Sequence, residues 1–361
     1  MGSRRASRAV ARSTGTFGVI GKYRHGFHPG EDRVRHFVSL MRVVSAAILV
    51  QFAAVPQAPA DSYPAKPVRI VVPWPAGSVS DSISRLIAEH ATPHLGVQIV
   101  VENKPGAAGV IGADYVAKSR PDGYVVLHGN SSQVTVVPAT GAKLPFDPVN
   151  DLAPVTLIGR GEMVLVAPAA LNLGTVSELI ALAKSRQDGL TYGTQGVGTN
   201  PHFAGALLVK TAAIEAIDVP YKGDNEVLID LLGGQLDFAF GFPLTSAPHV
   251  TAGKLKGLMV TSPRRIGSLP NVPTAAELGL TELEIVTWGG YFVPARTPNA
   301  VVARLNAALT RALNDPEVRA KFKNWGIEPA PSSVEEFGTF LAEERARWMK
   351  RAKLTGIRVS E

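Results

Sequence analysis

Two loops of the sequence combine glycine with hydroxyl and amide residues at points where a predicted strand passes into a predicted helix. They are PWPAGSVSD (Pro73 to Asp81) and GTQGVGTNPH (Gly193 to His202). At such a junction, unpaired backbone N–H groups and the positive end of the helix dipole attract an anion, and glycine lets the backbone come close to it. Each loop therefore predicts a site for a small acid, although Ser80 or Asp81 can also act simply as a helix cap.

A third polar loop, HGNSSQ, follows another predicted strand and presents Asn130, Ser131 and Ser132. Ligands on open α/β sheets gather at the carboxyl ends of the strands, where this loop would lie. An ordinary polar turn is the alternative interpretation. If the loops belong to two lobes, a closing cleft could hold one carboxylate from both sides.

Patterns typical of enzymes and metal sites are absent from the sequence. There is no G-x-S-x-G elbow, H-E-x-x-H or P-loop, and Gly193 to Gly198 does not fit G-x-G-x-x-G. His90 and His94 are four residues apart, but no acidic residue joins them on that face; His202 and His249 are interpreted as structural. The chain has no cysteine, which excludes disulfides, Cys-ligated zinc, iron–sulfur clusters and a thiol nucleophile. We therefore expect no enzymatic activity, no catalytic residue, no metal site and no cofactor.

The scaffold for these loops is predicted from alternating apolar runs and helical patterns, which are typical of βαβ units. A first series has strands at Val68–Trp74, Val97–Asn103 and Tyr124–His128, with helices at Ser80–Leu95 and Val110–Ser119. These elements predict one lobe with a mainly parallel sheet.

A second series has the same pattern. Strands are predicted at Met163–Ala167, Leu190–Thr194, Ile217–Tyr221, Leu236–Phe240 and Leu255–Ser262. Between them, Thr175 and Glu178 form a capping box for a helix ending near Arg186, a second helix begins near Asn200, and a third covers Glu226–Leu232. This series predicts a second lobe.

The C-terminal part is predicted to return to the first lobe. After the strand-like segment Glu284–Ala295 only helices are expected, at Pro298–Leu313 and Pro316–Trp325, with a last helix capped by Ser332 and Glu335. The length of 361 residues suits about two domains. We predict an α/β fold of two lobes joined by crossing strands, with lobe 1 formed by 61–162 plus 289–361 and lobe 2 by 163–288.

The positive charge of the chain is confined to its N-terminal part. Residues 1–60 hold nine of the 37 basic and two of the 30 acidic residues, which leaves 28 of each beyond and a net charge of zero there. Nucleic-acid binding, which needs a basic folded face, is therefore not expected. Within that part, Met41-Arg42, the apolar run Val43 to Val55 and Ala58-Pro59-Ala60 predict a signal peptide at about 41–60, cleaved before Asp61. Met1 and Met41 are both open as the start.

Several blocks of the mature sequence occur in an order that points to a known family. They are YPAKPVRIVVPWPAGSVSD, VVENKPGAAGVIGADYVAKSRPDGY, LPFDPVNDLAPVTLIG, VPYKG, DLLGGQLDFAF, PHVTAGKLKGLMVTSPRR and LPNVPTAAELGL. Together they resemble the tripartite tricarboxylate transporter substrate-binding proteins, also called the Bug family, over essentially Tyr63 to Ile357. The resemblance implies a periplasmic type II solute-binding fold that closes on a small carboxylate and delivers it to membrane permease subunits.

The resemblance also implies the ligand-binding residues. The family's first ligand loop, usually P-F-P-P-G-G-S-T-D, matches Pro73 to Asp81, and its second, usually S-x-G-x-G-S-x-x-H, matches Thr194 to His202. With the third loop, the candidates are Trp74, Ala76, Gly77, Ser78, Ser80, Asp81, Asn130, Ser131, Ser132, Thr194, Gln195, Gly196, Thr199, Asn200, His202, Gly241 and Phe242.

The main departure from the family is at Gly241-Phe242, where many relatives have Asp-Asn. The missing carboxylate, with Trp74 and Phe242 as flat walls, predicts an aromatic or otherwise amine-free carboxylate as the ligand. We expect a monomer. A ligand-sensing partner of a membrane sensor kinase would use the same fold, and the sequence leaves this alternative to transport open. A transcriptional regulator would need an N-terminal helix-turn-helix. Residues 1–60 have the apolar signal run instead, so this function is not expected.

Overall fold

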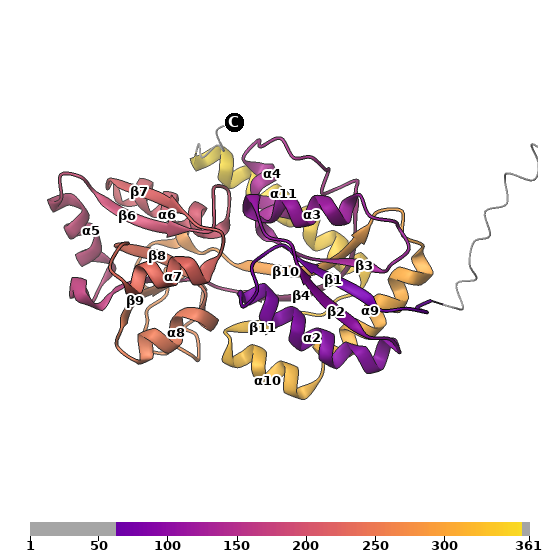
Figure 1. The fold of residues 1–361 in the computed structure, drawn as a ribbon. Coiled ribbons are helices and arrows are strands. Elements are labelled where there is room, and N and C mark those ends of the chain that lie inside the picture. The colour runs from indigo at the N-terminus through magenta and orange to yellow at the C-terminus, as the bar shows by residue number, and fades with distance from the viewer. Residues whose placement is uncertain (1–62, 356–361) are drawn as a thin grey trace, which may run out of the picture. The chain divides into compact units, whose positions relative to one another are not determined.

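Eleven strands form two sheets in the computed structural model, which describes residues 63–355 (Figure 1). These residues belong to one compact unit that spans Pro59–Glu361. The predicted signal peptide at 41–60 lies outside the described residues. None of the helices within 63–355 has the length and apolar character needed to cross a bilayer.

The first sheet has six strands in the order β11-β4-β10-β3-β1-β2. β1 pairs in parallel with β2 and β3, whereas β10 is antiparallel to both β3 and β4, and β11 is antiparallel to β4. The strands are β1 (Val68–Val72), β2 (Ile99–Asn103), β3 (Val125–Asn130), β4 (Leu152–Gly161), β10 (Thr287–Pro294) and β11 (Ile327–Pro329).

Helices cover both faces of the first sheet. Ile70 of β1 packs with α2 (Val79–Leu95), α9 (Asn299–Leu313) and α10 (Pro316–Asn324). The neighbouring Val71 points to the other face and packs with α3 (Val110–Ala117) and the first turns of α11 (Val334–Thr355). This alternation explains why the central strands are buried on both sides and read as continuous apolar runs.

The second sheet has five strands in the order β7-β6-β8-β5-β9. Leu165 of β5 belongs to the cluster with α5 and α6, whereas Val164 and Val166 belong to the cluster with α7 and α8. The strands are β5 (Val164–Pro168), β6 (Leu190–Thr194), β7 (Ala216–Pro220), β8 (Phe238–Gly241) and β9 (Leu255–Val260); the helices are α5 (Val176–Ser185), α6 (Asn200–Ala212), α7 (Asp224–Leu232) and α8 (Pro243–Thr251).

Short elements complete the described chain. They are η2 (Ala107–Gly109), η3 (Ser132–Val136), α4 (Val137–Ala139), η4 (Ala169–Leu171) and η5 (Thr281–Leu283). Of these, the π-helix η3 directly follows β3 and gives the third polar loop a helical course that the sequence analysis did not predict.

Two crossing segments connect the lobes built on these sheets. One runs from β4 into β5 through Met163, and the other leads from β9 back to β10. Thr261 pins them together, because its Oγ1 accepts a hydrogen bond from the backbone N–H of Met163 (2.9 Å) and donates one to the carbonyl of Ile285 (2.7 Å). The two-lobed α/β fold with crossing strands is therefore as predicted.

The last helix corrects two expectations. Its cap is Ser333 with Glu336, one residue later than predicted, because Ser332 accepts a hydrogen bond from the N–H of Leu157 in β4 (3.1 Å). The tail also packs on more than the first lobe: Trp348 near the end of α11 contacts Phe203 of α6 edge-on, with ring centroids 4.9 Å apart.

Besides the short elements η2 to η5 and α4, three elements were missed by the sequence analysis. The segment after Ala295 is not purely helical, because β11 pairs with β4 between α10 and α11. Strand β4 itself and helix α8 were also not assigned. By contrast, the capping box of α5 and the bounds of β6 are as predicted.

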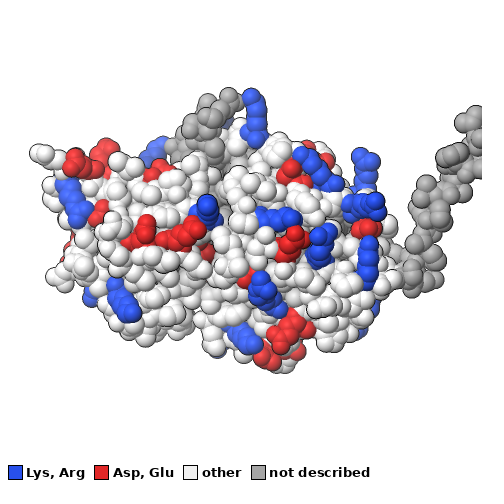
Figure 2. All heavy atoms as spheres, in the orientation of Figure 1, with Lys and Arg blue, Asp and Glu red and all other residues white. Residues whose placement is uncertain are grey.

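The charged residues of the body are mixed rather than gathered by sign. On the face shown in Figure 2, lysine and arginine side chains lie among aspartate and glutamate side chains. This distribution agrees with the zero net charge of the sequence beyond residue 60.

Candidate functional site

A cavity of about 80 Å³ lies between the two lobes and is lined by residues from both. The first lobe contributes the ends of β1 and β3, and the second contributes the starts of α6, α7 and α8. At roughly 10–15 Å³ for each water-sized probe, this volume has room for several waters, and therefore for a small organic acid.

The amino ends of four helices meet at this cavity. Its lining includes the first residue of α2 (Val79), of α6 (Asn200), of α7 (Asp224) and of α8 (Pro243). The amino end of a helix carries about half a positive charge, and the N–H groups of its first turn have no partner within the helix. Their convergence makes the cavity a favourable place for an anion without requiring a lysine or arginine.

The first predicted loop is held by its own side chains. Ser78 is the N-cap of α2, and its hydroxyl accepts a hydrogen bond from the N–H of Asp81. The buried carboxylate of Asp81 in turn accepts from the N–H of Gly77 (2.9 Å), Arg85 Nε (2.9 Å) and Asn103 Nδ2 (2.9 Å). Burial raises the pKa of Asp81, but these hydrogen bonds outweigh it and hold the pKa below its usual value. Asp81 therefore orders the loop rather than facing the cavity.

The second loop is also braced internally. Thr194 Oγ1 accepts from the N–H of Gly196 (3.3 Å), Thr199 Oγ1 donates to the carbonyl of Gly196 (2.8 Å), and His202 Nδ1 accepts from the N–H of Gly198 (3.4 Å). Burial lowers the pKa of His202, which keeps the ring neutral and able to accept. These residues shape the loop, and its two members in the cavity wall are Gln195 and Asn200.

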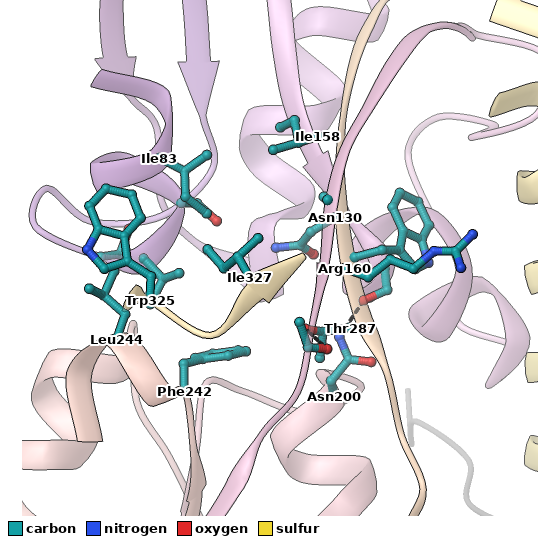
Figure 3. A pocket seen from close by; sticks show the side chains of 18 of the residues that line it. Ile83, Asn130, Ile158, Arg160, Asn200, Phe242, Leu244, Thr287, Trp325 and Ile327 are labelled. Atoms are coloured by element: carbon teal, nitrogen blue, oxygen red, sulfur yellow. Dashed lines mark hydrogen bonds between the residues drawn. The ribbon is translucent and has the colours of Figure 1, made fainter. Parts of the chain in front are cut away.

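Asn200 links the two lobes through the third loop. Its Nδ2 donates to Ser131 Oγ (2.6 Å) and to Ser132 Oγ (3.2 Å), and its backbone N–H lies 3.3 Å from Ser132 Oγ. All three residues are buried, and Figure 3 shows Asn200 pointing towards the end of β3. The Oδ1 atom of Asn200 has no hydrogen-bond partner.

Asp224 brings a carboxylate into the same wall. It is 9% exposed, and its Oδ2 atom has no hydrogen-bond partner. Burial raises the pKa of Asp224 to about 6. Hydrogen bonds from the backbone N–H groups of Asp224 itself and of Val79 on the facing lobe lower the pKa, but they offset only part of the effect of burial. The sequence analysis did not select this residue.

An apolar rim closes one side of the cavity. Phe242 and Leu244, at the start of α8, face Trp325 and Ile327, on either side of the turn from α10 to β11 (Figure 3). A Cβ atom on Gly326 would lie 3.0 Å from Cβ of Pro243, so the two lobes touch here through backbone and ring atoms. Apolar side chains from both lobes therefore border the polar wall on this side.

Cationic charge at the cavity is limited. Among the described residues that line it, Arg160 is the one lysine or arginine, and its guanidinium lies over the Phe340 ring, 4.9 Å from the centroid. In Figure 3 the Arg160 side chain points away from Phe242 and Trp325. His128 is neutral, because full burial lowers its pKa to about 3, and its Nδ1 lies 2.7 Å from Ser84 Oγ.

The structure divides the seventeen predicted site residues into two groups. Nine line the cavity: Trp74, Ser78, Ser80, Asn130, Ser131, Ser132, Gln195, Asn200 and Phe242. The other eight are set back from its wall: Ala76, Gly77, Asp81, Thr194, Gly196, Thr199, His202 and Gly241. Gly241 instead borders a smaller cavity together with Thr194, and a Cβ atom there would lie 2.3 Å from Ser246 Oγ.

Other lining residues were missed because no motif marks them. They include Asp224 at the start of α7 and Trp325 directly after α10. Arg160 of β4 and Thr287 of β10 also line the cavity. Trp74 lines the cavity but also belongs to the hydrophobic cluster of Ile70 with α2, α9 and α10, and 4% of its surface is exposed.

A second hollow lies on the other side of the crossing strands. It has a volume of about 940 Å³ and shares Arg160 and Glu162 with the cavity. Burial, with Glu328 nearby, raises the pKa of Glu162 to about 7. Within residues 63–355 no group of three or more histidine, cysteine, aspartate or glutamate side chains is arranged to hold a metal ion.

Comparison with family models decides the relationship of this chain. Residues 83–356 match the model of the tripartite tricarboxylate transporter family receptor. The chain belongs to this receptor family. Among curated relatives, it is 35% identical over 291 residues to the UPF0065 protein in the tcbD-tcbE intergenic region of Pseudomonas sp. strain P51, covering 80% of this chain and 86% of the relative. It is 32% identical over 321 residues to protein BugT of Bordetella pertussis, covering 89% and 98%.

Solved structures of similar proteins have the same fold. The periplasmic binding protein BugD aligns with a TM-score of 0.79 and 31% identity, covering 82% of this chain and 99% of BugD. MatC of Rhodopseudomonas palustris with bound malate aligns at 0.76 and 30%, covering 80% and 99%. R. palustris Rpa4515 with adipate aligns at 0.78 and 32%, covering 82% and 99%. Periplasmic binding proteins therefore share this two-lobed architecture.

Proposed function

We propose that this chain is an exported solute-binding protein that captures a small carboxylate between its lobes and delivers it to the permease subunits of a tripartite tricarboxylate-type transporter. The observation that carries the proposal is the meeting of four helix amino ends at one cavity between the lobes. Hydrogen bonds from N–H groups and hydroxyls to a carboxylate contribute about 1.5–3 kcal/mol each. A few of them, after ordering costs, correspond to an affinity near the micromolar level, about −8 kcal/mol.

The relatives support a carboxylate as the ligand class. Malate and adipate are the ligands of two solved relatives, and both are small dicarboxylates. Binding is proposed to favour the closed arrangement in which Asn200 bonds to Ser131 and Ser132, because a ligand shifts a conformational equilibrium by its differential affinity.

The lobes are proposed to consist of 61–162 plus 289–361 and of 163–288, with the ligand contacted by the candidate residues that line the cavity. We assign the mature protein to the periplasm, with a signal peptide at about 41–60. Intact-mass measurement of the exported protein should give a chain beginning near Asp61; a chain that retains 41–60 would contradict cleavage there.

The binding role is tested by thermal unfolding with mono-, di- and tricarboxylates. A ligand that binds only the folded state at 100 times its Kd should add about 2.7 kcal/mol to the free energy of unfolding. Methyl esters of the same acids are the control, because they lose the charge at the cost of one added methyl group for each acid group. Equal shifts with acids and esters, or no shift with any acid, would refute carboxylate capture.

A further inference from the structure

Asp224 is the one acidic residue that stands at the start of a helix in the cavity wall. It begins α7 in the second lobe and faces the start of α2 in the first. The carboxylate is more than nine-tenths buried, and one of its oxygens, Oδ2, lacks a partner. A buried acceptor without a partner is costly, so a bound ligand that supplies a donor gains more than its own hydrogen bond.

Among the described residues that line the cavity, no cation meets this need. The guanidinium of Arg160 is placed over Phe340, and His128 is neutral. Burial dominates the raised pKa of Asp224, about 6, and no charged side chain contributes to it. The carboxylate is therefore mostly ionised at neutral pH, while its Oδ2 atom has no partner and no charged side chain offsets its charge.

A second unpartnered oxygen belongs to the same wall. Asn200 is the first residue of the neighbouring helix α6, and its Oδ1 atom also has no donor. Its Nδ2 atom donates to Ser131 and Ser132, which fixes the orientation of the amide. The helix ends attract a ligand carboxylate, whereas these two oxygens require a donor. A ligand that carries only carboxylates would place its charge near Asp224 and leave both oxygens unpaired.

We propose that Asp224 is a specificity-determining residue that selects carboxylates bearing a hydrogen-bond donor, an ammonium or hydroxyl group, next to the acid. This inference rests on the proposed function of the cavity. The sequence analysis expected an amine-free ligand, because Gly241 stands where many relatives have an aspartate. The present inference differs, because Asp224 of α7 supplies a carboxylate beside the small cavity that Gly241 also lines.

The test uses sets of acids that differ by one substituent. Succinate, malate and aspartate form one set, and glutarate, 2-hydroxyglutarate and glutamate form another. Isothermal titration calorimetry on the wild-type protein should show the amino or hydroxy acid of the preferred length binding at least tenfold more tightly than the unsubstituted acid.

The variant Asp224→Asn keeps the shape of the side chain and removes its charge. It should reduce that preference at least tenfold, chiefly because the unsubstituted acid binds more tightly. Glu226→Gln is the matched control, because Glu226 lies in the same first turn of α7 but is exposed and outside the cavity wall. It should leave the preference unchanged.

The outcomes separate this inference from the proposed function. If acids bind but the unsubstituted member is the tightest in wild-type protein, the role of Asp224 is refuted while carboxylate capture stands. An unchanged preference in Asp224→Asn, with a folded variant shown by circular dichroism, also refutes it. If no acid of any kind binds, the proposed function fails and this inference fails with it.

Discussion

Two buried aspartates at the starts of helices show how the same local position serves different ends. Asp81 in the first turn of α2 accepts three hydrogen bonds, and its pKa is lowered in spite of burial. Asp224 in the first turn of α7 has an unpartnered oxygen, and burial raises its pKa to about 6. A satisfied carboxylate stabilises its loop, whereas an unsatisfied one at a cavity retains the capacity to bind something else.

The comparison extends to the two cavity walls. In the first lobe, the carboxylate of Asp81 accepts hydrogen bonds from Gly77, Arg85 and Asn103. In the second lobe, Asn200 and Asp224 each keep an unpartnered oxygen. We therefore expect the loss of Asp81 from the first loop to lower stability, and changes to Asn200 or Asp224 to alter ligand binding, with a gain in stability where the buried charge of Asp224 is removed.

The largest effect is expected for Asp81→Ala. It leaves the N–H of Gly77 and the side chain of Asn103 without their acceptor, and we expect a loss of about 3–4 kcal/mol in the free energy of unfolding. Urea unfolding measures this loss. Glu89→Ala, at an exposed position of the same helix, should change it by less than about 0.5 kcal/mol. Equal stability of the two variants would contradict the bracing role of Asp81.

Asp224→Asn should have the opposite effect on stability, and this effect should depend on pH. The folded protein holds the Asp224 proton more tightly than the unfolded chain, so ionisation costs stability as pH rises from about 4 to above 6. A pKa rise from 3.8 to about 6 corresponds to about 2–3 kcal/mol at pH 8. The variant should therefore melt higher than wild type at pH 8, and the difference should vanish near pH 4. A difference of constant size across this range would exclude the titration of Asp224 as its cause.

Asn200→Ala tests the buried link between the lobes. Losing the bonds to Ser131 and Ser132 should weaken binding of the best acid about tenfold, equivalent to about 1.4 kcal/mol, because the closed arrangement is less stable. Calorimetry at fixed pH measures the change. Affinity equal to that of the wild type would show that these bonds do not contribute to closure.

The smallest effect is expected for Asn225→Ala. Asn225 Nδ2 also bonds across the lobes, to the carbonyl of Gly77 at 3.2 Å, but at an exposed site. Water can replace this bond, so the affinity should change less than about twofold, or about 0.4 kcal/mol. A loss as large as that of Asn200→Ala would remove the distinction between buried and exposed links.

Local patterns in the sequence were sufficient for much of the fold. The capping box at Thr175 and Glu178 and the β-prone segment LTYGT of β6 can be recognised from neighbours in the chain, and both are found as predicted. The cap of α11 was misplaced by one residue because two serines are adjacent and the choice between them depends on β4. Strand β11 has three residues and forms only by pairing with β4.

The lining residues of the cavity could be predicted from the sequence where they directly follow a strand. Ser131 and Ser132 were selected because they follow a predicted strand, at the end of an open α/β sheet where ligands gather, and Asn200 was selected because it lies in the second glycine-containing loop, which matches the family's pattern. Asp224 was missed because GDNEV resembles an ordinary acidic helix start, and its burial depends on α2 of the other lobe. Arg160 and Thr287 lie within the crossing strands, where no local signal distinguishes a lining residue from a core residue.

A crystal structure of the protein with its tightest-binding acid tests the central claim most directly. We predict that the acid lies in the cavity between the lobes, with its carboxylate at the amino ends of the helices and a donor group within hydrogen-bond distance of Asp224 Oδ2. Density for the acid in the second hollow, which Arg264 and Arg347 also line, with the cavity holding only water, would contradict the account.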